Sequence, residues 1–188
     1  DRPTEGEVLL DGKSIVHLTE KEISAFRRNN LGFVFQDFNL LDTFSLRDNI
    51  YLPLVLAGED YREMEQKIRP VAKALRITEI LEKYPYEVSG GQKQRVAVAV
   101  SMICGKEVVV FDEPTSGLDY DSMEQVSKLI QDLAKNKVIF VVTHDYEFVC
   151  QTCSRLIRFD RHVLADDLPV CIENKERIYA LMEQGEKK

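Results

Sequence analysis

The chain has 188 residues, of which 44% are hydrophobic, and its formal net charge is −7. This length and apolar content suit one domain with a sizeable core. The negative charge argues against a broad surface for nucleic acid or anionic lipid. The longest apolar stretch, residues 96–104, is about half of a membrane span, so we expect a cytosolic chain.

The four cysteines are too scattered for a disulfide framework, and we interpret them as small buried thiols: Cys104, Cys150, Cys153 and Cys171. The spacing of Cys150 and Cys153 is also typical of half a zinc site or a redox pair. No second ligand pair stands nearby in the sequence.

The first predicted elements are a β-hairpin, a short helix and a strand. Apolar segments flank Asp11 and Gly12, a pair that favours a tight hairpin turn, so we expect a hairpin over residues 7–16. Thr19 and Glu22 have the spacing of a capping box, which predicts a helix from there to about Arg28. Residues 31–35 favour a strand.

After Gln36 the apolar residues change to helical spacing. Ser45 predicts the start of a helix that Pro53 should bend. A second helix, which Pro70 should kink, carries one apolar face: Met64, Ile68, Val71, Ala72 and Leu75. A third short helix is expected over residues 78–83. The segment therefore predicts an all-helical insertion.

Beyond this insertion strands and helices alternate. We expect helices at 92–102, 121–135 and 146–153, and strands at 108–111, 138–142 and 156–159. A right-handed crossover makes the first two of these strands parallel, which brings Asp112, Glu113 and His144 to one edge of the sheet. Residues 173–188 are predicted to form a charged helix with a frayed end.

Two segments predict nucleotide chemistry. Ser89, Gly90 and Gly91 stand directly before a predicted helix, where unpaired backbone N–H groups and the helix dipole favour an anion such as phosphate. Asp112 and Glu113 end a strand at the carboxyl edge of a parallel sheet, where α/β proteins bind ligands. Mg²⁺ and water are the expected guests there.

These segments resemble the signature and Walker B motifs of the ATP-binding cassette (ABC) ATPases. The signature-like run is Val-Ser-Gly-Gly-Gln-Lys-Gln-Arg, residues 88–95. Other matches follow in the family's order: Gln36 resembles the Q-loop glutamine, residues 116–119 the D-loop, and residues 143–145 the switch-histidine segment. The order makes the resemblance highly specific, and it covers about residues 5–167.

The resemblance implies a role for each residue at the sheet edge. Asp112 would hold Mg²⁺ through a water molecule, with Gln36 as a second metal-site residue. Glu113 would orient and polarise the attacking water, and His144 would contact the γ-phosphate of ATP. Gln36 would also connect the metal ion or the water to the helical insertion.

The resemblance also implies partners. Ser89, Gly90, Gly91 and Gln92 would close over ATP held by a second ABC ATPase subunit, in a homodimer or with a related chain, and Asp119 would shape the dimer seam. A transmembrane permease would dock near residues 38–44. The protein would then lie in the cytoplasm, peripheral on the inner face of the cell membrane, with ATP and Mg²⁺ as cofactors and without nucleic acid.

The fold implied is α/β and P-loop NTPase-like, with a mostly parallel sheet core and an inserted helical subdomain. A single, partial ABC ATPase domain would span 1–188: a core at 1–36 and 96–170, a helical signature subdomain at 37–95, and a helical tail at 171–188.

The family's P-loop, Gly-x-x-x-x-Gly-Lys-Ser/Thr, is not expected in this sequence. The tempting match at residues 11–14 has Glu7 where the loop needs glycine, and its flanks predict a hairpin instead of a helix. We therefore expect truncated N-terminal strands, and 188 residues that alone neither bind ATP tightly nor hydrolyse it.

Some features leave the function open. The segment up to about residue 95 looks like exporter-linked subunits, whereas the segment from residue 100 onward leans towards vitamin and metal importers. Val100 stands where the family usually has arginine. The alternatives are a non-catalytic cassette that gives only its signature loop to a partner site, which Glu113 and His144 argue against, and a DNA-repair ABC ATPase, which the short insertion argues against.

Overall fold

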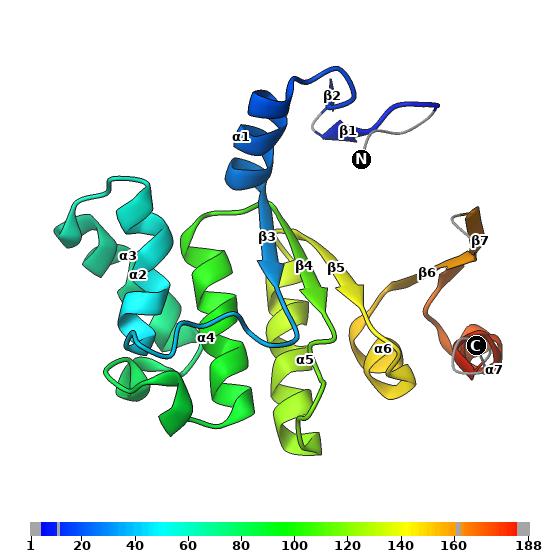
Figure 1. The fold of residues 1–188 in the computed structure, drawn as a ribbon. Helices are drawn as coiled ribbons and strands as arrows, with labels where there is room; N and C mark the ends of the chain where they lie inside the picture. Colours follow the sequence, from blue (N-terminus) through cyan, green and yellow to red (C-terminus); the bar gives the residue numbers. More distant parts are fainter. Residues whose placement is uncertain (1–4, 11, 161–162, 184–188) are drawn as a thin grey trace.

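The computed structural model describes residues 5–10, 12–160 and 163–183 (Figure 1). Its centre is a three-stranded parallel sheet in the order β3-β4-β5. The strands are β3 (Leu31–Val34), β4 (Val108–Asp112) and β5 (Val138–Val142). The predicted strands and their parallel direction are confirmed.

Two helices cover one face of this sheet: α4 (Gly90–Ile103), which packs on β3, and α5 (Tyr120–Ala134), which packs on β5 (Figure 1). Side chains alternate along the strands, so Val34 and Phe111 are buried beneath the helices. Phe33 and Phe140, which point to the opposite face, are about half exposed. The sheet therefore has one covered face and one apolar face that the described helices leave open.

The predicted helical insertion lies between β3 and β4. It contains α2 (Leu46–Leu56), α3 (Tyr61–Ala74) and two short 3₁₀ turns, η1 (Thr78–Ile80) and η2 (Pro85–Glu87), which lead into α4. Pro53 and Pro70 lie inside α2 and α3, and neither proline ends its helix. The predicted third helix over 78–83 is only the η1 turn.

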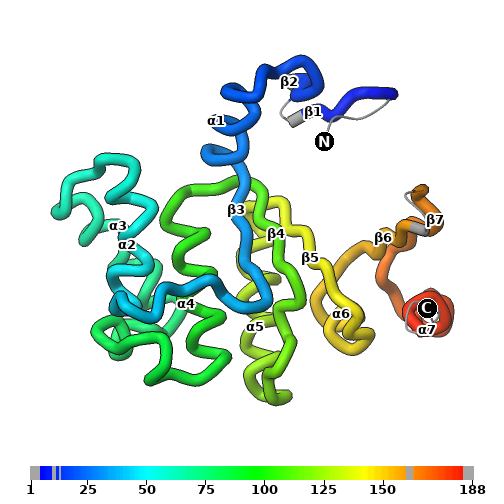
Figure 2. The backbone as a smooth tube through the Cα atoms, in the orientation of Figure 1, coloured from blue at the N-terminus to red at the C-terminus, as the bar shows by residue number. Residues whose placement is uncertain are grey.

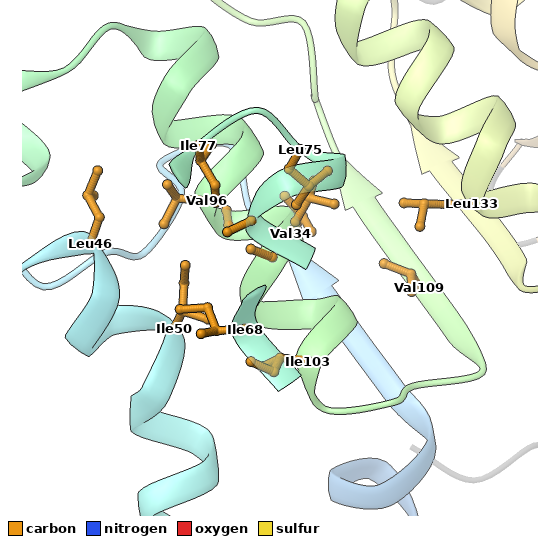
Figure 3. Close-up of a cluster of buried hydrophobic side chains, with 14 of the residues drawn as sticks. Val34, Leu46, Ile50, Ile68, Leu75, Ile77, Val96, Ile103, Val109 and Leu133 are labelled. Carbon is orange, nitrogen blue, oxygen red and sulfur yellow. The ribbon is translucent and has the colours of Figure 1, made fainter. Parts of the chain in front are cut away.

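The core extends from the sheet into this helical lobe. Figure 3 shows Ile50, Ile68 and Val96 pointing toward one another from α2, α3 and α4, and each is almost completely buried. Val34 and Val109 continue the same cluster to the sheet. Burying aliphatic side chains of this size contributes about 1.5–3 kcal/mol each. The insertion and the sheet therefore share one core.

The N-terminal part precedes this core. A hairpin forms from β1 (Leu9–Leu10) and β2 (Lys13–Ser14), as predicted, although Asp11 of its turn lies outside the described residues. Helix α1 (Glu20–Asn30) begins with the predicted capping box between Thr19 and Glu22 and runs two residues beyond the predicted end. None of the residues of α1 is buried, so this part adds little to the core.

The C-terminal part contains a strand that the sequence did not predict. After α6 (Tyr146–Thr152), β6 (Arg155–Asp160) pairs with β7 (Val163–Pro169) in a separate antiparallel sheet, followed by η3 (Ile172–Asn174) and α7 (Lys175–Glu183). Figure 2 shows this hairpin and α7 beyond α6, away from β5. Residues 184–188 of the predicted tail lie outside the described residues.

One buried polar side chain has no partner in the part of the chain that the structure describes. Gln94 of α4 is 1% exposed, and neither its Nε2 nor its Oε1 makes a hydrogen bond. An unpaired buried amide costs about 1–3 kcal/mol. Gln94 therefore reduces the free energy of unfolding at the centre of the helical lobe.

We expect Gln94→Met, which preserves size and removes the amide, to raise the free energy of unfolding by about 1 kcal/mol in urea denaturation. The matched control is Gln151→Met, at an exposed position of α6, which should change the free energy of unfolding by less than about 0.5 kcal/mol. A loss of stability in Gln94→Met would mean that the amide has a partner in solution.

Candidate functional site

The predicted edge of the sheet brings together the ends of β4 and β5. Asp112 pairs in register with Val142, and the Glu113 N–H then donates to the Val142 carbonyl at 2.8 Å. The Glu113 backbone has a φ of 45°, a left-handed conformation that is rare for a side chain of this size. The chain therefore turns sharply at Glu113, directly after the strand.

The Glu113 carboxylate is held on both of its oxygens. Oε1 lies 2.8 Å from Nδ1 of His144, and Oε2 accepts a hydrogen bond from the Thr143 hydroxyl at 3.1 Å. The Glu113 side chain is 20% exposed, whereas that of His144 is 74% exposed. The structure thus brings two predicted residues together and adds Thr143, a contact that strand periodicity alone does not reveal.

Gln36 reaches this edge from the end of β3. Its Nε2 donates to the Ser116 hydroxyl at 3.0 Å, and the Ser116 N–H donates to the Glu113 carbonyl at 3.1 Å. The Gln36 side chain is thus tied to the turn that follows Glu113 and not to Glu113 itself. The loop after β5 is fixed to the same turn, since Thr115 donates to Asp145 at 3.2 Å.

Asp112 offers oxygen ligands for a metal ion. Its side chain is exposed at the sheet edge, and carboxylate and amide oxygens are ligands that Mg²⁺ accepts. Gln36 supplies the nearby amide. No group of three or more metal-binding His, Cys, Asp or Glu residues occurs among the described residues. One or two carboxylates plus water and phosphate oxygens is the usual Mg²⁺ environment in nucleotide sites, so the residues present fit this ion.

The signature-like turn caps α4. Ser89 is the N-cap residue, its N–H donates to Oε1 of Gln92 at 2.9 Å, and its Oγ accepts from the Gln92 N–H. The helix therefore begins at Gly90, two residues before the predicted start. Capping engages the Gln92 side chain locally, and the predicted contact of these residues with ATP stays a prediction.

The two glycines of this turn pack against the segment after Glu113. A Cβ on Gly90 would lie 3.3 Å from Cδ2 of Leu118, and one on Gly91 would lie 3.0 Å from Oγ of Ser122. Glycine permits this close approach of α4 to the start of α5. A hollow of about 210 Å³ lies beside the turn, lined by Ser89, Gly91, Gln92, Arg95, Ser122, Gln125 and Val126.

Asp119 has a local role that the sequence analysis missed. It is the N-cap of α5, where its Oδ1 accepts a hydrogen bond from the Ser122 N–H at 2.7 Å. This hydrogen bond holds the pKa of the Asp119 carboxyl below its ordinary value. An aspartate directly before a helical run is a known cap signal, and it was available in the sequence.

An apolar groove of about 270 Å³ lies between the end of β3 and α2. Its lining includes Phe38, Leu41, Leu52, Pro53 and Leu56. The region thus includes part of the segment 38–44 where a permease contact was predicted.

Asn49, which the sequence analysis overlooked, shapes the wall of this groove. It is 5% exposed; Oδ1 accepts from the Leu41 N–H at 2.7 Å, while Nδ2 donates to the carbonyls of Leu41, Phe44 and Ser45. An asparagine within an apolar helix was the signal.

The fold and the edge residues define a class of protein. In the dimeric, ADP- and phosphate-bound structure of the ATP-binding cassette MJ0796, 76% of the chain aligns with 91% of the present chain, with a TM-score of 0.75 and 29% sequence identity. The chain therefore has the P-loop NTPase fold of the ABC ATPases, which confirms the fold class predicted from the sequence.

The family follows from the sequence matches. The ABC transporter family matches residues 1–116, more than half of the chain. The chain belongs to this family. No helix among the described residues combines the length and apolar character that crossing a bilayer requires.

Two relatives illustrate the range of the family. The chain is 44% identical over 159 residues to the ABC transporter ATP-binding protein YvcR of Bacillus subtilis, covering 84% of this chain and 61% of that protein. It is 39% identical to the bacitracin export ATP-binding protein BceA of Halalkalibacterium halodurans, covering 84% and 62%. The chain thus spans about three fifths of these curated relatives. Proteins of import systems also match.

The Asp119 cap predicts a pH dependence. Because the folded-state pKa lies below the ordinary 3.8, the cap's stabilisation is complete above that pH. It is lost as the pH falls through the lowered folded-state value, because the unfolded state takes up its proton first. We expect Asp119→Asn to lose less stability than the wild type between pH 5 and pH 3 in urea denaturation. The control Asp121→Asn, in the same helical turn, should lose as much stability between pH 5 and pH 3 as the wild type does.

The Gly91 contact predicts non-additive substitutions. Alanine favours a helix over glycine by up to about 1 kcal/mol, but in Gly91→Ala the contact with Ser122 should cancel this gain. In a Ser122→Gly background the same substitution should stabilise the protein. Thermal or urea denaturation of the four proteins measures the coupling, and additive effects would show that the α4–α5 approach is looser than the structure has it.

Proposed function

We propose that this chain forms the ATP-binding and ATP-hydrolysing part of an ABC transporter subunit that powers transport across a membrane. The observation that carries the proposal is the carboxylate of Glu113, oriented by Thr143 and His144 at the carboxyl edge of a parallel sheet. Family membership supports it. Hydrolysis needs a water molecule placed in line with the γ-phosphate and a group that orients it.

Glu113 is the water-orienting residue in this proposal. Two contacts fix its carboxylate, and a fixed base loses less freedom when the reaction begins. His144 is more exposed than Glu113, which supports the proposal that it would contact the γ-phosphate. A ligand there would compete with Glu113 for the imidazole, so the contact between these two side chains depends on whether nucleotide is bound.

Asp112 and Gln36 would hold Mg²⁺, which neutralises phosphate charge during hydrolysis when bound. Asp112 presents an exposed carboxylate at the end of β4. Gln36 contacts Ser116 in the turn after Glu113 and immediately precedes the helical insertion. Because Gln36 directly precedes the insertion in the chain, a shift of this glutamine would move the start of the insertion.

A second ABC ATPase subunit completes the proposed site. Ser89 is exposed and Gly90 and Gly91 open helix α4, so backbone N–H groups at the helix start can meet a phosphate of ATP held by the other subunit. Gln92 supports the turn, and Asp119 lies at the neighbouring start of α5. The similar cassette MJ0796 is dimeric.

A transmembrane permease would dock in the apolar groove lined by Phe38, Leu41 and Leu52. The protein would then work in the cytoplasm, attached to the inner face of the cell membrane through this partner. In the same proposal, residues 1–36 and 96–170 belong to the α/β subdomain, 37–95 to the helical signature subdomain and 171–188 to a helical tail. The relatives named for export and import support a transport role.

The competing function is a non-catalytic cassette, and one substitution distinguishes it from an active ATPase. We expect Glu113→Gln, in the protein assembled with its permease and any partner ATPase, to lower kcat for ATP hydrolysis by about 10²–10⁴-fold. ATP binding should persist, because the amide preserves the shape of the side chain. Measuring steady-state phosphate release and nucleotide binding tests both statements.

The matched control is Glu107→Gln, an exposed glutamate just before β4, which should leave kcat unchanged. Unchanged turnover in Glu113→Gln would remove Glu113 from the mechanism. A wild-type assembly whose hydrolysis comes entirely from the partner ATPase would support the non-catalytic alternative.

A further inference from the structure

A second hollow, of about 310 Å³, lies where the end of α3 and helix α4 meet α5, and the proposed ATPase function does not use it. Arg76 follows α3, Arg95 lies on α4, and Gln125 and Lys128 lie on α5; all four line the hollow. Leu75 and Leu129 contribute apolar wall. A cavity of this volume is at the lower end of the range of small-molecule sites.

Among the residues that the structure describes, neither arginine of this hollow has a carboxylate partner. The ion pairs found within the described parts of the chain include neither Arg76 nor Arg95. The Nε of Arg95 is buried and makes no hydrogen bond to any described residue, while its Nη1 donates to Oε1 of Gln125 at a long 3.3 Å. The carboxylate lining the hollow, Asp132, lies 2.6 Å from Nζ of Lys135.

The two guanidinium groups also repel each other. Burial and the neighbouring charge of Arg76 both lower the pKa of Arg95 from its ordinary value. Lys128 adds a third cation, although Glu124 lies 3.1 Å from it. An anion in the hollow would relieve the repulsion between these cations.

The backbone at Arg76 is unusual as well. Its φ of 54° lies in the left-handed region, which is unfavourable for a non-glycine residue unless the surroundings hold it. Here the Arg76 N–H donates to the Lys73 carbonyl and the Ile77 N–H to the Ala72 carbonyl. The turn thus fixes the start of the Arg76 side chain at the rim of the hollow.

We propose that this hollow binds the phosphate group of a small phosphorylated molecule, with Arg76 and Arg95 as its ligands. Planar guanidinium groups bind phosphate oxygens through paired hydrogen bonds, and Lys128 adds charge. Leu75 and Leu129 would contact the less polar part of the ligand. A free phosphate ester and a lipid headgroup present the same chemistry.

The hollow also adjoins the signature turn. Arg95 and Gln125 line both this hollow and the one beside Ser89 and Gly91. An anion that draws Arg95 to itself weakens its long contact with Gln125 and so changes the wall next to the signature turn. Phosphate binding in the hollow should therefore also change the surroundings of residues 89–92.

The test is a titration of the 188-residue chain with inorganic phosphate and with glycerol 3-phosphate, at constant ionic strength and with EDTA, followed by calorimetry and by backbone amide NMR. We expect one saturable site. Arg76→Asn, which keeps a residue tolerant of positive φ, and Arg95→Gln should each weaken binding at least about tenfold. Arg95→Lys, which keeps the charge, should weaken it less than Arg95→Gln.

The matched control is Lys73→Gln, which removes an exposed cation from the same helix end outside the hollow. This variant should bind both phosphate ligands as tightly as the wild type does. A second arm measures cosedimentation with phosphatidylcholine vesicles with and without phosphatidic acid. Arg76-dependent binding only to the acidic vesicles would identify a lipid headgroup as the source, and binding in solution a free ester.

Three outcomes would overturn the proposal: no Arg76-dependent binding in either arm up to about 10 mM phosphate, equal weakening by Lys73→Gln, or amide shifts confined to residues away from α3, α4 and α5. Thermal unfolding of each variant checks that it is folded. Because no nucleotide or Mg²⁺ is present, failure of this proposal and failure of the proposed ATPase function are separate results.

Discussion

The parallel pairing of β4 with β5 is the constraint on which the candidate site depends. The register ends with Asp112 opposite Val142, and the ladder continues for one more hydrogen bond from Glu113. Thr143 and His144 must then follow beside Glu113, because parallel strands emerge at the same edge. A slip of one residue would turn every side chain of β5 to the other face of the sheet and separate these groups. The apolar alternation that buries one face therefore also positions the carboxylate.

Much of the scaffold was predictable because its determinants are local. Capping residues such as Thr19 and Ser45 mark helix starts by chemistry that acts within four residues. The hairpin strand β7 was not predicted because two acidic residues, Asp166 and Asp167, interrupt its apolar pattern. They are accommodated by Arg158 and Arg155 across the hairpin, and such cross-strand pairs are visible only once the register is known.

The site shows the same division. Parallel strands predict that Glu113 and His144 approach each other, and they do. The hydrogen bond from Gln36 to Ser116 joins residues eighty positions apart. Hydrogen bonds of this kind depend on the detailed course of two loops, which no spacing in the sequence encodes. The cap formed by Asp119 is the opposite case, because its signal lies within a few residues of the helix start. The sequence analysis assigned Asp119 to the dimer seam instead and did not predict the cap.

Asn49 gives the groove beside α2 a mechanical property. One side chain of the helix satisfies four backbone groups of the preceding loop, at Leu41, Phe44 and Ser45. A loop held this way has little freedom to bend, because bending it would break several hydrogen bonds to one buried side chain. A force applied at Phe44 would therefore move the loop and α2 together as one rigid unit, and the buried residues packed against α2 would move with it.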